Sequence, residues 1–209
     1  MASDASANVV VSNLDENERF TAVISGSTLR DFVNLAAKFT TGTGDLTVTG
    51  ASALLTARLT GTEPTTTYVA ELWTSAGITP DTLIASSAPS TEPGVGTSPS
   101  SSNTIFDFTF AGVDLEANTD YWISFRGIDT SATGVRLTDS DDESFAADGW
   151  SIDDTGFARI TNDGGSWADA SGPNLGWVPI FSITAVPAPG AVALLGGAGV
   201  LAARRRRVR

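Results

Sequence analysis

Carboxylates are the first side chains of this chain whose type and spacing could do chemistry. Seven of them crowd into one stretch, namely Asp139, Asp141, Asp142, Glu143, Asp148, Asp153 and Asp154. Proteins hold hard cations such as Ca²⁺ with several oxygen ligands on loops, so the first four of these residues are candidate calcium ligands. No Gly follows Asp141 at the offset of an EF-hand loop and no Glu closes such a loop. A solvated acidic loop is therefore the simpler interpretation. Apart from a weak Ca²⁺ site, the sequence predicts no cofactor.

Enzymatic chemistry has few suitable side chains here. The chain contains no His and no Cys. Their absence removes the His-based triad, the imidazole proton shuttle, the Cys nucleophile and the commonest ligands of transition metals. Two carboxylates can hydrolyse glycosides only at a defined separation across a cleft, and no local pattern singles out such a pair. We predict a protein that is not an enzyme, with a secreted hydrolase as the least favoured alternative.

The five tryptophans divide by their sequence context. Trp73 and Trp122 lie in segments of alternating polarity, which predicts that they fill the core of a sheet structure. Trp150, Trp167 and Trp177 lie in or beside segments rich in Gly, Asp and Ser, where exposed rings could stack on sugars. Burial of such rings at one end of a β-sandwich is the commoner outcome. A carbohydrate-binding module for an exopolysaccharide or cell surface is therefore the alternative function.

The charge of the chain is unevenly distributed. All 24 acidic residues precede Val186, whereas five of the 12 basic residues follow it. The first 185 residues thus combine seven basic with 24 acidic side chains, a net charge of −17. A domain so acidic repels nucleic acid and anionic lipid head groups, so we predict no nucleic-acid partner.

The elements that must position these side chains are strands. Short β-branched or aromatic runs alternate with Gly, Pro, Asp and Ser over residues 1–185, a pattern typical of all-β proteins. The length suits one domain that buries roughly 70% of its unfolded surface. We therefore predict an antiparallel β-sandwich over residues 1–185. Its strands are expected at Asn8–Leu14, Phe20–Ile24, Phe32–Phe39, Leu46–Leu59, Thr67–Thr74, Ile105–Phe110, Tyr121–Arg126, Val135–Leu137, Phe157–Ile160 and Trp177–Thr184.

Two segments carry more specific expectations. In the longest predicted strand, Gly50 is expected to mark a bulge or bend. The second half of that strand also has helical spacing, but its threonines and flanking turns favour a strand. Residues 75–104 contain four prolines and many serines, which predicts a long exposed connection. Within it, Leu83 and Ile84 are the residues expected to touch the core.

The last 24 residues differ in composition from the rest. They begin with Val186, Pro187, Ala188 and Pro189. A run of 14 residues without a polar side chain follows at 190–203, and the chain ends in Arg204, Arg205, Arg206, Arg207 and Arg209. As a helix this run spans about 21 Å, less than the roughly 30 Å of a hydrocarbon layer, so a permanent anchor is marginal. The arginines favour a cytoplasmic position for the chain end.

This order of Val-Pro-x-Pro, short apolar helix and arginine cluster resembles the PEP-CTERM sorting signal, the tail of exported bacterial proteins that exosortase recognises. The resemblance covers residues 186–209. The family usually has Glu between the two prolines, where this chain has Ala188. A plain C-terminal transmembrane anchor and an incidental basic tail are the alternatives.

The resemblance implies a route for the protein. The chain would pass the inner membrane, be cut near Pro187–Pro189 by an exosortase-type membrane enzyme, and reach the cell surface or the extracellular space. Residues 1–20 contain neither a basic n-region nor a long apolar h-region, so we expect that a signal peptide is missing from this chain. The predicted function is that of an exported surface or extracellular-matrix protein, with exopolysaccharide as a further partner.

A second resemblance covers the body of the chain. Short cues at Phe39–Gly42, Leu46–Leu55, Glu71–Trp73, Leu115–Thr119 and Tyr121–Trp122 resemble the choice-of-anchor R domain of bacterial surface proteins. The match spans residues 32–184. It implies a β-sandwich of the jelly-roll type ahead of the sorting tail, and it implies no catalytic residue.

Overall fold

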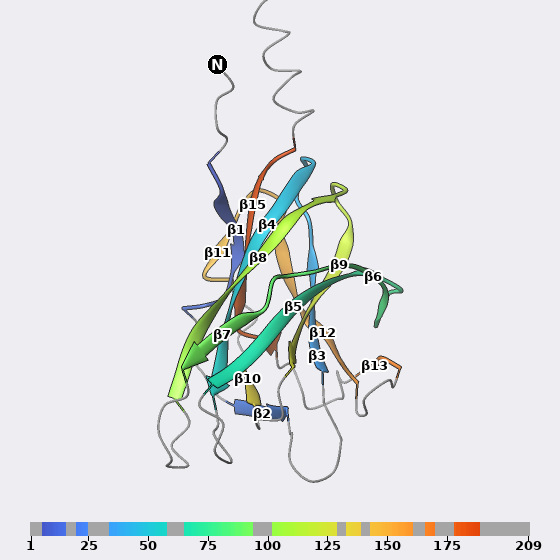
Figure 1. The fold of residues 1–209 in the computed structure, drawn as a ribbon. Coiled ribbons are helices and arrows are strands. Elements are labelled where there is room, and N and C mark those ends of the chain that lie inside the picture. Colours follow the sequence, from blue (N-terminus) through green and yellow to red (C-terminus); the bar gives the residue numbers. More distant parts are fainter. Residues whose placement is uncertain are drawn as a thin grey trace, which may run out of the picture.

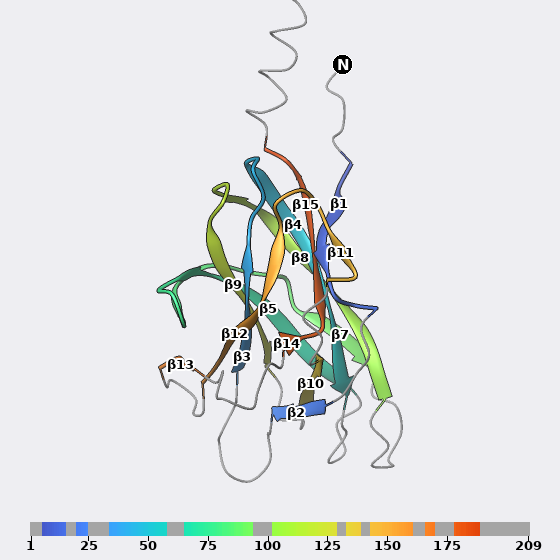
Figure 2. The same ribbon diagram turned by 180° about the vertical axis from the view of Figure 1, so that it is seen from behind.

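The computed structural model describes residues 6–15, 20–24, 34–57, 65–93, 102–128, 133–138, 143–160, 166–169 and 178–188. The secondary structure in these ranges consists of strands joined by turns, and every strand pairing is antiparallel. The strands form two sheets that pack face to face and curl strongly (Figures 1 and 2). The prediction of an all-β, sandwich-like fold is therefore confirmed.

The first sheet has eight strands. They are β1 (Asn8–Ser12), β2 (Phe20–Ile24), β4 (Leu46–Ala57), β8 (Ser102–Leu115), β10 (Thr133–Thr138), β11 (Phe145–Ala146), β14 (Val178–Pro179) and β15 (Phe181–Pro187). Strand β4 pairs with β8 along one edge and with β15 and then β10 along the other. The register shifts next to Gly50 in both β8 and β15 pairings, so the predicted irregularity at this glycine is confirmed.

The second sheet has seven strands. They are β3 (Asn34–Thr40), β5 (Thr65–Ser75), β6 (Pro80–Ser86), β7 (Ser90–Pro93), β9 (Asp120–Gly127), β12 (Ser151–Ile160) and β13 (Ala168–Asp169). The central strand β9 lies between β3 and β5, and β12 and β6 lie outside these two. This sheet carries the side chains of the candidate site.

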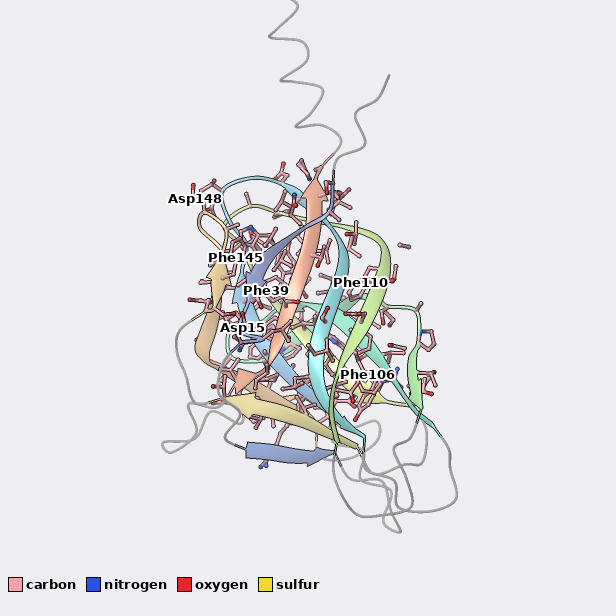
Figure 3. All side chains as sticks on the ribbon, turned by 90° about the vertical axis from the view of Figure 1, so that its left-hand side faces the viewer. Asp15, Phe39, Phe106, Phe110, Phe145 and Asp148 are labelled. Carbon is pink, nitrogen blue, oxygen red and sulfur yellow. The ribbon has the colours of Figure 1, made fainter. Side chains whose placement is uncertain are left out.

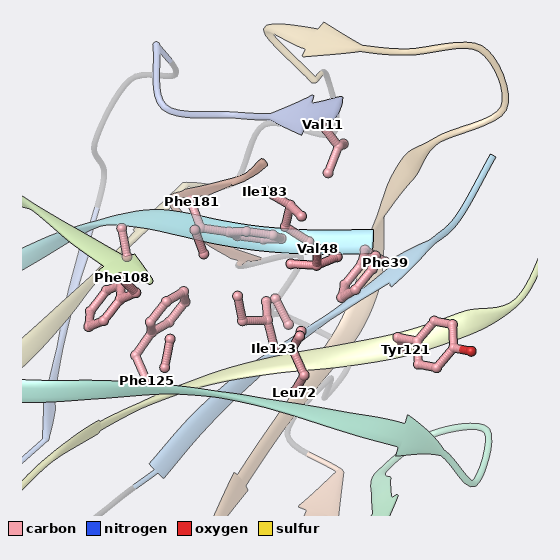
Figure 4. Close-up of a cluster of buried hydrophobic side chains, with 14 of the residues drawn as sticks. Val11, Phe39, Val48, Leu72, Phe108, Tyr121, Ile123, Phe125, Phe181 and Ile183 are labelled. Carbon is pink, nitrogen blue, oxygen red and sulfur yellow. The ribbon is translucent and has the colours of Figure 1, made fainter. Parts of the chain in front are cut away.

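The core lies between the two sheets and follows the alternation of the sequence. In β8, Phe106, Phe108 and Phe110 are buried whereas Asp107 and Thr109 are exposed. Figure 4 shows that residues of both sheets meet between the layers, among them Phe39, Val48, Leu72, Ile123, Phe125, Phe181 and Ile183. Each large apolar side chain buried in this way contributes roughly 1.5–3 kcal/mol.

The segment predicted as a long exposed connection contains two strands, β6 and β7. They pair with successive halves of β5 and complete that edge of the second sheet. Leu83 and Ile84 are 44% and 38% exposed, so the expectation that they touch the core is wrong. The prolines misled the prediction because Pro80, Pro89 and Pro93 stand at strand ends or between strands, where the ladder does not need their amide donor.

The first and last strands leave the body at the same end. Strand β1 pairs antiparallel with β15, and Asn8 lies opposite Ala185. Figure 1 shows β1 beginning and β15 ending at the top of the molecule, whereas β2 and β10 lie at the opposite end.

Candidate functional site

The acidic stretch does not form a cluster in the part of the chain that the structure describes. Asp139, Asp141 and Asp142 lie outside the described residues. Glu143 accepts a 2.7 Å hydrogen bond from the backbone N–H of Ile152, which ties the stretch to β12. Asp148 is exposed in the turn after β11, where Figure 3 shows it at the edge of the body. Within the described ranges no three acidic side chains are grouped to hold a metal ion, and the calcium site stays a prediction.

Trp150 lies in the core rather than in an open loop. Its exposure is 5%, and its ring stacks on Phe39 with ring centres 6.0 Å apart and planes 6° apart. Gly42 and Gly149 bring the two loops around it into backbone contact, because a Cβ on Gly42 would clash with the Asp148 carbonyl oxygen and lie 2.6 Å from the Trp150 ring. Neither face of this indole is free for a sugar, so its candidacy as a stacking residue is wrong. Trp177 lies outside the described residues.

Three other tryptophans gather on the outer side of the second sheet. Trp73, Trp122 and Trp167 pack with Ala36 and Ala158 in a cluster separate from the core between the sheets. We call these five residues the tryptophan face. Trp122 is fully buried, whereas Trp73 and Trp167 are partly exposed. Sequence alternation thus placed Trp73 and Trp122 correctly in strands but assigned them to the wrong side of the sheet.

The strand register explains how this face is built. One row across the sheet runs from Ala158 on β12 through Ala36 on β3 to Ser124 on β9, three small residues. The next row pairs Trp122 on β9 with Trp73 on β5. Because small residues lie beside large ones, the indole of Trp167, which precedes β13, packs over the alanines and against the ring of Trp73.

Hydrogen bonds fix two of the three indoles. The Trp73 Nε1–H donates to the Ser124 hydroxyl and the Trp122 Nε1–H donates to the Ser75 hydroxyl, both at 3.1 Å. The Trp167 Nε1–H is buried and has no partner, and neither has the side-chain oxygen of Asn34, which is two residues before Ala36 on β3. A buried polar group without a hydrogen-bond partner lowers the free energy of unfolding by about 1–3 kcal/mol, so both atoms are unfavourably placed in the folded chain.

An ion pair between a buried carboxylate and a partly exposed guanidinium lies beside the tryptophan face. The Glu71 side chain on β5 is 6% exposed and accepts bonds from Nε and Nη2 of Arg126 on β9, at 3.0 and 2.8 Å. The Ser124 hydroxyl donates to the other Glu71 oxygen at 3.3 Å and accepts from Trp73. Arg126 keeps N–H donors beyond those two, because a guanidinium has five. Sequence reasoning missed this network, since the partners stand more than 50 residues apart.

A second charged group lies at the other side of this face. Lys38 on β3 forms ion pairs with Asp153 on β12 at 2.8 Å and with Asp120 on β9 at 3.3 Å. Burial by itself lowers the pKa of the Lys38 ammonium, but its hydrogen bonds to the two carboxylates and their charges outweigh burial, so that the pKa lies above its ordinary value. Thr40 also donates to Asp120, at 2.7 Å.

The first residues of the predicted sorting motif belong to the sheet. Val186 lies opposite Thr47 and Pro187 opposite Leu46, and the Ala188 N–H donates to the Asp45 carbonyl oxygen at 3.2 Å. Pro189, the apolar run at 190–203 and the basic residues Arg204, Arg205, Arg206, Arg207 and Arg209 lie outside the described residues. Among the residues that are described, no helix has the length and apolar character needed to cross a bilayer.

Comparison with known proteins assigns no relative to this chain: no family model matches it, and no curated protein matches it.

Proposed function

We propose that the chain is an exported, non-enzymatic protein of the bacterial cell surface or extracellular matrix, delivered by its C-terminal tail through exosortase-type processing. The observation that supports this most is where the last strand ends along the chain. That strand, β15, ends at Pro187 inside the Val-Pro-Ala-Pro motif. The strand pairing that the structure describes thus extends only into the start of the motif, as expected of a cargo domain followed by an address segment. We further propose that the two sheets have jelly-roll connectivity.

The geometry suits a body held from one end. The start of β1 and the end of β15 lie side by side at one end of the body (Figure 1). During transit the arginines would stay on the cytoplasmic side and the apolar run would lie in the inner membrane. The acidic body, with its charge of −17, would lie outside and be repelled by anionic head groups.

The sheet also restricts where the processing enzyme cuts. An enzyme that binds a peptide in an extended conformation forms hydrogen bonds with the backbone N–H and C=O groups of that peptide. In residues that already belong to a sheet, these groups are bonded to neighbouring strands. Val186 and Pro187 pair with β4 and Ala188 bonds to Asp45. In the folded protein the bond that is cut therefore lies after Ala188.

The intact mass of the protein recovered from its own cells tests this function. We expect a product that retains Ala188 and lacks the arginine cluster. A variant with Arg204–Arg207 changed to Ala should lose this cut, because nothing then holds the tail at the membrane. Recovery of the native protein with Arg209 still present would refute processing. A product that ends before Ala188 would retain the function but overturn the position of the cut.

A further inference from the structure

Three indoles on the outer face of a sheet need an explanation. The outward side of an antiparallel sheet is ordinarily polar, because only the inner side faces the core. Here the inner side of the second sheet already packs against the first sheet with Leu72, Ile123 and Phe125. The tryptophan face adds nothing to that core, yet it places the partly exposed rings of Trp73 and Trp167 next to each other, with centres 5.5 Å apart and planes at 82°.

The polar atoms at this face are incompletely satisfied. The Trp167 Nε1–H is a donor without an acceptor and the Asn34 Oδ1 an acceptor without a donor. The side chain of Arg126 is 39% exposed and has N–H groups beyond the two atoms bonded to Glu71. The two unpaired atoms are covered by protein, whereas the Arg126 N–H groups are exposed and can donate to the hydroxyl oxygens of a ligand.

The charges at this face favour an uncharged ligand. Arg126 is neutralised by Glu71, and Lys38 is paired with Asp120 and Asp153, so the five ionised groups sum to −1. The body as a whole carries −17, which repels an anionic polymer. The same charge opposes association with a second copy of this chain through this face.

We propose that the tryptophan face binds a neutral polysaccharide. Sugar rings stack on the exposed parts of Trp73 and Trp167, and sugar hydroxyls bond to the free N–H groups of Arg126. This inference goes beyond the proposed function and does not depend on the sorting tail.

Native electrophoresis of the full chain in gels that contain a soluble polysaccharide tests this proposal. The neutral probes are galactomannan, mixed-linkage β-glucan and dextran, and alginate is the anionic probe. We expect retardation by at least one neutral probe and none by alginate. Trp73→Ala should weaken that binding about tenfold, equivalent to about 1.4 kcal/mol. The matched control is Phe145→Ala, which removes an exposed ring from β11 on the other sheet (Figure 3) and should leave binding unchanged.

A second variant separates the site from the stability of the fold. Trp167→Phe retains an aromatic ring with a smaller stacking face, so we expect several-fold weaker binding by a chain that still unfolds cooperatively in urea. The proposal is overturned if none of the three neutral probes retards the protein, or if alginate alone does. It is also overturned if Phe145→Ala weakens binding as much as Trp73→Ala, or if sedimentation shows that Trp73→Ala only disrupts a dimer.

Discussion

At the scale of single residues, two glycine-containing loops approach each other closely. Gly42 lies against Gly149 and beneath Trp150, so that even one added methyl group has no room. Gly149 also has φ of +78°, a conformation that side chains with a Cβ rarely adopt. These two positions hold Trp150 on Phe39 and so join the loop after β3 to the loop before β12.

Gly42→Ala should therefore destabilise the protein by about 1–3 kcal/mol, because the new Cβ overlaps the Asp148 carbonyl and the Trp150 ring. Urea unfolding followed by tryptophan fluorescence measures the change. Gly44→Ala is the matched control two residues on, since a Cβ there has no atom within 4 Å. Equal midpoints for the two variants would contradict the steric argument.

Lys38 makes the stability depend on pH at the alkaline end. Its ammonium has a raised pKa in the folded state, so its ion pairs contribute fully below the unfolded value of about 10.4 and are lost as pH rises through the folded value. We expect the unfolding free energy to fall above about pH 10.4. Lys38 is the only lysine of the chain, so no other lysine contributes to this loss of stability.

Lys38→Arg is the variant that checks the assignment, because a guanidinium stays charged above pH 12. Denaturant unfolding at a series of alkaline pH values should show a smaller loss in Lys38→Arg than in the native chain. Parallel curves for the two proteins would show that the ion pairs of Lys38 do not cause the loss.

At the scale of elements, β8 shows how a strand separates core from surface. Phe108 is 3% exposed and faces the core, whereas Ile105, three residues earlier, is 50% exposed. Phe108→Ala should cost about 3–5 kcal/mol, because it removes buried area and leaves a cavity between the sheets. Ile105→Ala should change stability by less than about 0.5 kcal/mol. Thermal or urea unfolding of the two variants tests the face assignment, which would be wrong if their effects were similar.

Strands β6 and β7 are elements that the sequence did not predict. Both strands are short and bounded by prolines, and β6 has only a few apolar residues, so no local pattern separates them from a loop. They form strands because they pair with the edge of β5, and this edge is available only after the sheet has formed.

At the scale of the whole molecule, Ala188 is the last residue that the structure places against the body, through its hydrogen bond to Asp45. A chain that ends at Ala188 should therefore unfold at the same urea concentration as the full chain. A chain that ends at Ile183 loses the pairing of Thr184 to Pro187 with β4 and should be clearly less stable. Equilibrium urea unfolding of the three chains measures this. If removal of residues 189–209 itself lowered the midpoint, the tail would be part of the folded domain rather than a separate address.

The sequence alone determined the all-β class, the position of most strands, the irregularity at Gly50 and the alternation within strands such as β5 and β8. These features are local, because a period of two in side-chain polarity arises within a few residues of chain. The charge of the body and the composition of the tail were equally visible.

Only the tertiary structure decided which side of each strand faces the core. Alternation along β5 placed Tyr68, Ala70 and Leu72 on one face and Glu71 and Trp73 on the other. Because an indole is largely apolar, the sequence did not indicate that Trp73 lies on the outer face. The Glu71–Arg126 pair, the two ion pairs of Lys38 and the packing of Trp167 against Trp73 all join segments that are distant in sequence. Such contacts depend on strand order and register, which are set by the pairing of whole sheets rather than by any local pattern.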